Sequence, residues 1–211
     1  MTVLDVAYKN QTRFGGPASP LMSDHRALQV ANRQLDLYEA TKEGRVFHGN
    51  TAAAGNVLPI FSNTTQEMGL WNSSTTVNAV LTRVALTYVS TTGAAGGFVL
   101  GYNTGAGAAL GGTITAITST TPTNGLVGAG RTSQCTFTGA AATVTAPTIY
   151  RHIGLNQLVI TATDATNTQW TAIADFPGDI IIPPGSAVWV AGNIATLIIM
   201  AGTMTWVEED L

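Results

Sequence analysis

The chain has 211 residues, which is enough for one large domain, or for a domain with an appendage, and enough to bury a real core. Only 10% of the residues are charged, the formal net charge is −3 and the sequence pI is about 5.5. This balance argues against a nucleic-acid-binding protein, because such a protein needs basic residues at the phosphates. The single cysteine, Cys135, excludes an internal disulfide and a cysteine-based zinc cluster, and we expect it to be a small strand residue facing the core.

The first 43 residues differ in composition from the rest and are predicted to form an arm. Residues 1–47 contain six of the nine basic and five of the twelve acidic residues, whereas residues 48–207 contain three basic and four acidic ones. The N-terminus lacks a basic start followed by an apolar stretch, so no secretory signal is expected. Because its apolar residues are few, the arm is expected to lie on another surface and not to form a core.

Two local signals describe the backbone of this arm. Four glycine and proline residues favour an extended segment: Gly15, Gly16, Pro17 and Pro20. A helix capped by Ser23 would then place four residues on one face: Leu28, Ala31, Leu35 and Tyr38. The alternation of Leu35 and Leu37 is compatible with a strand, and the helix is the favoured alternative.

The segment from residue 44 to residue 211 is predicted to be a β-sandwich. Threonine, valine and isoleucine favour strands, and glycine and asparagine mark the turns between them. Runs such as "MGLWN", "NAVLTRVALTYVS", "TITAITST", "TIYRHIG", "NQLVITATD" and "TQWTAIADF" indicate about seven to nine short strands with a turn roughly every ten residues. We therefore expect an all-β antiparallel sandwich of jelly-roll type, preceded by the extended, partly helical arm. No repeat of fixed period is visible, which excludes solenoids and propellers.

The run from Asp179 to Gly202 contains no charge after its first position. A membrane-spanning helix is not predicted, because short Val-, Ile- and Trp-rich runs alternate with "PPGS" and "GN" and no Lys or Arg cluster flanks them. Pro183 and Pro184 must lie where a strand ends, and Gly185 permits a tight reversal, so a β-hairpin is predicted. Near-continuous apolar strands of this kind are covered on both faces or lie at an interface.

No catalytic, cofactor-binding or metal-ligating residue is predicted, and an enzyme is not expected. The chain has no G-x-S-x-G motif, and the glycine-rich "GYNTGAGAALGG" lacks a phosphate-loop lysine and a following helix. Its three histidines lie in different segments without metal-ligand spacing: His25, His48 and His152. A calcium ion held on a loop by backbone and side-chain oxygen atoms stays an open alternative.

The carboxylates available to a hydrolase are few. Between residues 48 and 207 they are Glu67, Asp164, Asp175 and Asp179. The most plausible cluster would combine the three aspartates with His152. Asp175 and Asp179 flank "FPG", however, which predicts a turn.

Three stretches resemble virion proteins of tailed bacteriophages. They are "GRVFHGNTAAAG", "GLWNSSTTVNAVLTRVALTYVS" with the glycine-rich run after it, and "GDIIIPPGSAVWVAG". The similarity covers roughly residues 44–207 and leaves the arm uncovered. Its motif is an apolar pair with Asn, a small-residue turn and N-x-V-L-x-R/K-V, matched here by Leu70, Trp71, Asn72, Asn78, Val80, Leu81, Arg83 and Val84.

The resemblance implies a capsid-associated jelly roll, expected to be a trimeric decoration or cement protein in the virion. Its expected partners are further copies of itself and, through the arm, the major capsid protein, with no nucleic acid and no membrane. The resemblance supplies no functional residue. Trimerisation is expected through the uncharged stretch between Asp179 and Glu208, so that a charge at Val190 or Ile198 would disturb a buried face.

Three other functions remain open at this point. A tail or fibre receptor-binding head would share the fold and the trimer. A single jelly-roll major capsid protein usually faces nucleic acid and has a basic arm, whereas the N-terminal segment here, residues 1–47, has six positive and five negative residues and is nearly neutral. A secreted glycan-active enzyme is disfavoured by the missing signal and the scarce carboxylates.

Overall fold

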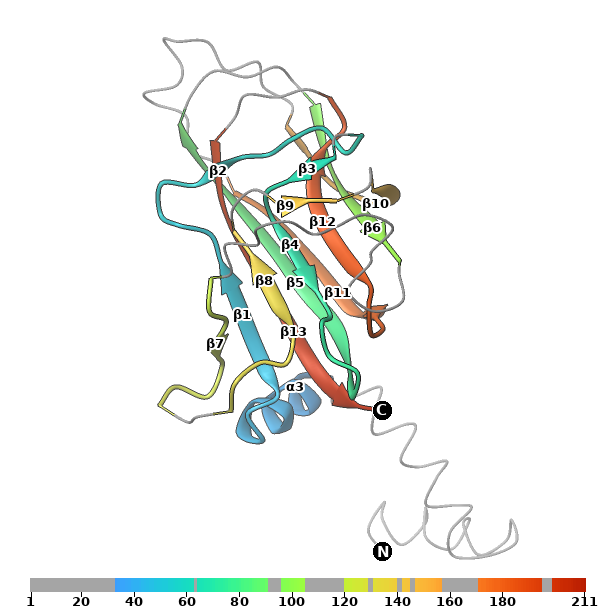
Figure 1. Cartoon of the computed structure of the whole chain (residues 1–211). Coiled ribbons are helices and arrows are strands. Elements are labelled where there is room, and N and C mark those ends of the chain that lie inside the picture. Colours follow the sequence, from blue (N-terminus) through green and yellow to red (C-terminus); the bar gives the residue numbers. More distant parts are fainter. Residues whose placement is uncertain are drawn as a thin grey trace, which may run out of the picture. The chain divides into compact units, whose positions relative to one another are not determined.

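The computed structural model describes residues 33–62, 64–90, 96–104, 120–128, 131–139, 142–144, 147–156, 171–194 and 199–211 (Figure 1). The chain divides into two units, Met1–Glu43 and Gly44–Leu211. In the first unit the structure describes helix α3 (Arg33–Lys42). The predicted cap Ser23 and the Gly- and Pro-rich segment lie outside the described residues, as do the predicted strands in "TITAITST" and "NQLVITATD" apart from their end residues Thr120 and Asn156. None of the helices that the structure describes is long and apolar enough to span a membrane.

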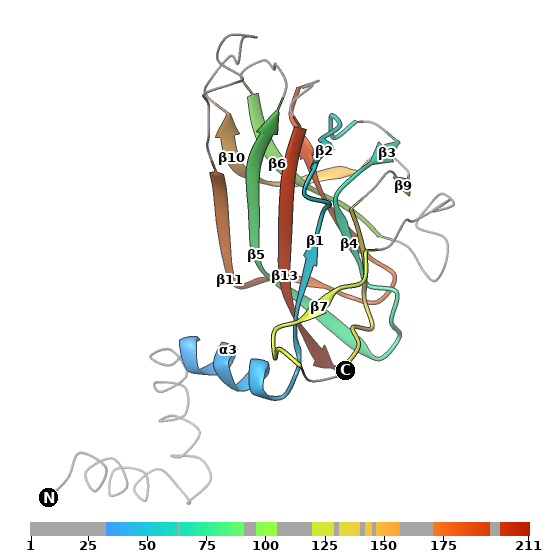
Figure 2. The ribbon, with the colours of Figure 1, turned by 90° about the vertical axis from the view of Figure 1, so that its left-hand side faces the viewer.

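The second unit is built from two antiparallel sheets, which confirms the predicted all-β sandwich (Figures 1 and 2). The first sheet has the order β11 (Thr171–Ile182), β5 (Val77–Ser90), β13 (Ile199–Asp210), β1 (Val46–Asn50) and β7 (Thr123–Asn124), with β2 (Asn56–Val57) also paired to β13. The second sheet has the order β10 (Thr148–Asn156), β6 (Gly96–Asn103), β12 (Ala187–Gly192), β4 (Gly69–Trp71) and β8 (Thr136–Thr138). A further two-stranded sheet pairs β3 (Thr65–Gln66) with β9 (Ala142–Thr143).

The core lies between the two large sheets and follows from period-two alternation along their strands. In β13, Met200, Met204 and Trp206 are buried while Ala201, Thr203 and Thr205 are half-buried on the other face. The rings of Trp206 and Phe47 stack with their centroids 6.1 Å apart. Cys135 is buried in this core directly before β8, so the prediction of its burial is confirmed.

Strand β12 explains why the run after Asp179 is uncharged. The strand is central in the second sheet, and all six of its residues are buried. Val188 and Val190 belong to the main core, whereas Ala187 and Trp189 belong to a second cluster with Ala142 and Val144. Both faces of β12 are therefore covered within one chain, and the apolar residues of this strand are no argument for a subunit interface. The choice of Val190 as an interface position was wrong for this reason, and Ile198 lies outside the described residues.

The turn at Pro183–Gly185 joins two sheets, so the predicted β-hairpin was wrong. Strand β11 pairs with β5 in the first sheet, while β12 pairs with β4 and β6 in the second. The prolines lie where β11 leaves its ladder and have no backbone N–H to donate, and Gly185 has a φ of 75°. The chain therefore reverses as predicted, but the strand after the turn, β12, belongs to the second sheet and not to the sheet of β11.

Asn72 fixes this turn from the end of β4. Its side-chain amide donates hydrogen bonds to the carbonyl oxygens of Val77 (2.8 Å) and Ile182 (2.9 Å). Its backbone N–H donates to the Ser186 carbonyl, and its carbonyl accepts from the Gly185 N–H. A fully buried asparagine thus satisfies backbone groups of two separate segments, the start of β5 and residues 182–186 around the turn.

Candidate functional site

Two of the carboxylates considered for catalysis, Asp175 and Asp179, are each held by an arginine. Asp175 accepts a hydrogen bond from Arg83 Nε at 2.6 Å, and Asp179 pairs with Arg151 at 2.7 Å. Both pairs are exposed. Asp164 lies outside the described residues. Among the residues that the structure describes, no group of three or more His, Cys, Asp and Glu is placed to hold a metal ion.

The segment "FPG" forms a bulge inside β11, so the predicted turn between strands was wrong. The register with β5 shifts between Asp175 and Ile180, and Gly178 has a φ of 86°. Phe176 stays buried, and the guanidinium of Arg151 lies 5.6 Å from the centre of its ring. The bulge places Asp179 beside Arg151 of β10, in the other sheet.

The histidines are placed separately. His48 in β1 is half-buried, and its Nδ1 lies 3.0 Å from the Thr205 hydroxyl. Burial lowers the pKa of His48 below its ordinary value. His152 is exposed in β10, and His25 lies outside the described residues. Burial also raises the pKa of the Glu67 carboxyl above its ordinary value.

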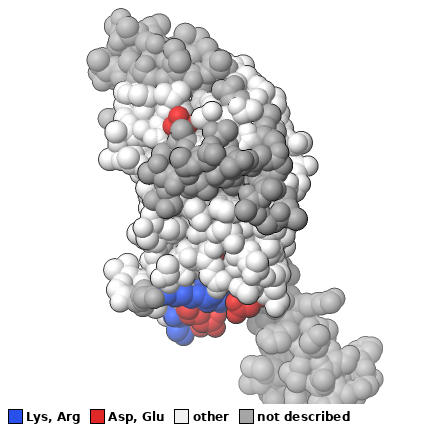
Figure 3. Space-filling view, in the orientation of Figure 1, with Lys and Arg blue, Asp and Glu red and all other residues white. Residues whose placement is uncertain are grey.

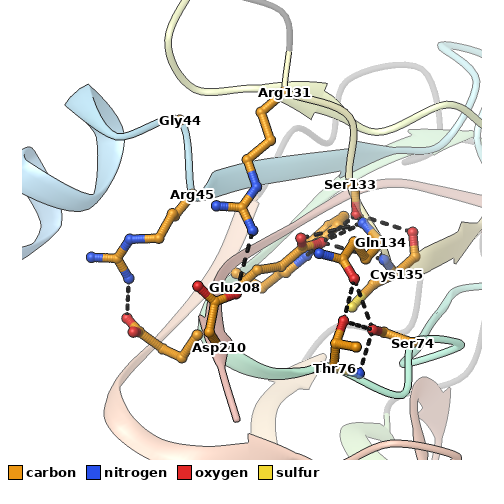
Figure 4. Close-up of polar contacts among 12 residues, drawn as sticks. Gly44, Arg45, Ser74, Thr76, Arg131, Ser133, Gln134, Cys135, Glu208 and Asp210 are labelled. Atoms are coloured by element: carbon orange, nitrogen blue, oxygen red, sulfur yellow. Dashed lines mark hydrogen bonds and ion pairs between the residues drawn. The ribbon is translucent and has the colours of Figure 1, made fainter.

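Glu208 is the most enclosed carboxylate in the described chain, and the sequence analysis did not select it. The residue is fully buried near the end of β13 (Figure 4). Its side chain accepts hydrogen bonds from the Ser133 hydroxyl (2.6 Å) and the Gln134 N–H (3.0 Å). Longer contacts come from the Cys135 N–H (3.3 Å) and the Trp206 indole N–H (3.4 Å). The alternation Met204, Trp206, Glu208 was the available signal, because it continues the buried face of the strand.

This arrangement holds a loop and is not suited to proton transfer with a substrate. The carboxylate is occupied by donors from residues 133–135, which it fixes to the C-terminal strand. Burial raises the pKa of the Cys135 thiol strongly, and the negative charge of Glu208 raises it further, which disfavours the reactive thiolate form. Exposed pairs flank the carboxylate: Arg45 with Glu209 at 2.5 Å and Arg131 with Asp210 at 3.7 Å.

An apolar pocket of about 120 Å³ lies between the sheets beside the crossing turn. Its lining contains no charged residue and comes from β6, β10, β11, the turn and β12: Tyr102, Asn103, Thr104, Tyr150, Ile180, Ile181, Ile182, Pro183, Ser186, Ala187 and Val188. The rings of Tyr102 and Tyr150 meet edge to face with centroids 5.9 Å apart. The pocket is suited to an apolar group. Its lining also includes two tyrosines and the small polar residues Asn103, Thr104 and Ser186.

The strands beside the rim of this pocket carry exposed apolar side chains. Strands β10 and β11 form edges of their sheets and expose four large apolar side chains: Ile149, Tyr150, Ile173 and Ile181. Strand β11 also carries Asp175 and Asp179, which form the exposed pairs with Arg83 and Arg151. Figure 3 shows the opposite face, the one toward the viewer in Figure 1, where most of the described surface has neither Lys or Arg nor Asp or Glu. An edge with several exposed large apolar residues is typical of an association site.

Comparison of the chain with protein-family models, with curated proteins and with solved structures found no match in any of the three.

Proposed function

We propose that this chain is a structural virion protein, a trimeric capsid decoration protein with a jelly-roll sandwich that reinforces the shell by binding neighbouring capsid subunits. The order in which the strands pair is the observation that supports this proposal most. Eight strands, taken in chain order, are β1, β4, β5, β6, β10, β11, β12 and β13. The first pairs with the eighth, the second with the seventh, the third with the sixth and the fourth with the fifth, all antiparallel.

This pairing corresponds to one long antiparallel ribbon that is rolled up so that its strand pairs alternate between two sheets. The pairs β1–β13 and β5–β11 lie in the first sheet, and the pairs β4–β12 and β6–β10 lie in the second. A jelly roll has eight strands and two Greek keys arranged in this way, and viral capsid proteins are among the proteins that use it. Fold alone does not give function, so the proposal also depends on the surface and on the sequence resemblance.

The surface favours association over turnover. The exposed apolar side chains of β10 and β11 provide area that is stabilised when another protein covers it. Homomeric interfaces are more apolar than ordinary protein surface. In the proposed mechanism each sandwich buries the part of this side around Tyr150 and Ile181 against another copy, and the N-terminal arm, residues 1–43, binds the major capsid protein. Many copies on one shell then give avidity, although each contact is small.

A tail or fibre receptor-binding head is the second candidate, and the aromatic pocket favours it. Tyr102 and Tyr150 lie beside Asn103, Thr104 and Ser186, and aromatic rings next to small polar groups suit a sugar. The two candidates differ in where the protein lies on the particle and in copy number.

Quantitative mass spectrometry of gradient-purified particles of the virus that encodes the chain tests the proposal. A decoration protein is expected at a copy number comparable to that of the major capsid protein, whereas a receptor-binding head is expected at only a few copies per particle. Absence of the chain from intact particles would contradict both candidates.

A further inference from the structure

We propose that Val127 of one copy inserts into the apolar pocket of the next copy, so that three identical contacts close the ring. This inference rests on the proposed homotrimer and names the surfaces that form it. It follows from two features of the described chain: an apolar side chain that is almost fully exposed, and an apolar pocket with exposed residues at its rim.

Val127 is the most exposed of the large apolar residues that the structure describes, at 94%. It lies in the loop after β7, between Leu126, which is half-buried, and Gly128. Gly128 has a φ of 84°, a backbone conformation that L side chains rarely adopt, and it turns the chain directly after the valine. The loop therefore directs a branched apolar side chain into water, which is unfavourable unless another surface covers it.

The base of this loop is held by Asn124. Its side-chain amide donates to the carbonyl oxygens of Gly44 (2.7 Å) and Arg131 (3.2 Å), and its side-chain oxygen accepts from the Leu126 N–H (2.8 Å). The Gly125 N–H donates to the Val46 carbonyl. A loop fixed in this way loses little conformational entropy when it binds, which favours its use as a preformed contact.

The pocket has the matching chemistry. Its lining is uncharged, and two of its lining residues are exposed at the rim, Tyr150 at 52% and Ile181 at 58%. The loop from Thr123 to Gly128 contains no charged residue either. Contact between the two surfaces would therefore bury no unpaired charge, which is the main cost that prevents association of unrelated surfaces.

The two surfaces lie on different parts of the sandwich, so a contact between them joins unlike patches of two copies. The loop follows β7 and the pocket lies at the end of β11, and these strands are opposite edges of the first sheet (Figures 1 and 2). A contact between different patches on two copies is heterologous, and it produces a ring when the rotation between copies closes. A trimer of decoration type is such a ring, with one Val127 and one pocket used in every copy.

Charge substitutions on the purified full-length protein test this contact. Val127→Asp and Ile181→Asp each place a charge in the proposed contact, at positions that are exposed in the single chain. Each is expected to raise the concentration at which half the protein is trimeric by about 100-fold or more, measured by light scattering. Far-ultraviolet circular dichroism is expected to stay unchanged. Ile173→Asp is the matched control, with the same residue type, the same strand and an exposure of 59% outside the pocket, and it is expected to remain trimeric.

Cross-linking tests the direction of the contact. Val127→Cys combined with Ile181→Cys in one chain, oxidised with diamide, is expected to give covalently linked trimers on a denaturing gel without reductant. Either single variant is expected to stay a single chain, because the native Cys135 is buried. Disulfide-linked dimers of a single variant would show that like surfaces meet, and would overturn the heterologous contact.

The remaining outcomes also separate this inference from the proposed function. A wild-type protein that is not trimeric, a trimer that survives Val127→Asp, or dissociation by Ile173→Asp as complete as by Ile181→Asp would each overturn the contact. A wild-type protein that is not trimeric would also contradict the trimer in the proposed function, whereas the other two outcomes leave that trimer intact. None of these measurements involves particles, so each leaves the proposed attachment to virions as it stands. Absence from purified particles would instead contradict the proposed function and leave the contact intact.

Discussion

At the level of single residues, the buried carboxylate of Glu208 connects the C-terminal strand to the loop before β8. The donors from residues 133–135 are separated from it by more than 70 positions in the chain, so the contact fixes two distant segments. The neighbouring Glu209 forms only an exposed pair with Arg45. Two adjacent glutamates therefore have different energetic roles.

Glu208→Gln is expected to destabilise the sandwich by about 2–4 kcal/mol, because the substitution replaces a charged acceptor and turns an amide N–H₂ toward N–H and O–H donors. For a domain of this size the melting temperature should fall by about 5–15 °C. Glu209→Gln is the matched control and should change stability by less than about 1 kcal/mol. Equal melting temperatures for the two variants would contradict the role given to Glu208. Thermal unfolding followed by circular dichroism measures both.

His48 gives the folded state a dependence on pH. Because burial lowers the pKa of His48 in the folded chain, the unfolded chain binds a proton more readily as the pH falls below the unfolded pKa of about 6.5. Stability should therefore be complete above that pH and should decrease as the pH falls through the interval between the unfolded and folded pKa values.

We expect the melting temperature of the wild-type protein to fall more between about pH 7.5 and pH 5.5 than that of His48→Gln, which keeps a polar group near Thr205. The exposed His152→Gln serves as the control and should follow the wild type. A His48→Gln protein with the same pH dependence as the wild type would show that another group is responsible.

At the level of elements, the crossing turn between β11 and β12 depends on Asn72. Its buried side chain bridges the end of β11 and the start of β5. The backbone of Asn72 also forms hydrogen bonds with Gly185 and Ser186. Asn72→Ala is expected to cost about 2–4 kcal/mol, because two buried carbonyl groups lose their donors. Ser73→Ala, one residue further along the chain and exposed, should cost less than about 1 kcal/mol. Urea unfolding of the two variants, with similar slopes, measures the difference, and an equal midpoint would contradict this account.

The sequence predicts the positions of individual strands and turns better than it predicts which strands pair with each other. Alternation identifies the buried face of β5 and β13, and the Pro-Gly signal gives the position of the turn at Pro183–Gly185. It does not say which strand lies beside which, because β pairing joins residues far apart in the chain. A turn that joins two sheets therefore has the same sequence signal as a β-hairpin turn. In the same way, the bulge at Gly178 within β11 has the sequence signal of a turn between two strands.

The candidate sites were less accessible to sequence analysis for the same reason. The pocket is lined by β6, β10, β11, the turn and β12, and only their arrangement brings Tyr102 beside Tyr150. Aspartates in the sequence suggest chemistry, whereas the structure pairs Asp175 and Asp179 with arginines from neighbouring strands. The apolar edge became visible only when β10 and β11 were placed at the edges of their sheets.

At the level of the whole molecule, the arm and the sandwich are expected to act separately. Both core clusters consist of residues after Gly44, the first of which is Phe47. A protein that begins at Gly44 keeps the carbonyl that Asn124 binds, and should melt within a few degrees of the full-length chain. It should bind virus particles at least about tenfold more weakly, because the arm is proposed to supply the attachment. Unfolding of the shortened protein, or unchanged binding, would contradict the separation of roles.

The central claim is that the chain is a capsid decoration protein. Electron microscopy of intact particles labelled with a gold-conjugated antibody against the sandwich tests it most directly. If the chain is a decoration protein, the gold label is expected over the whole capsid surface. Label confined to the tail or its fibres, or intact particles without label, would contradict it.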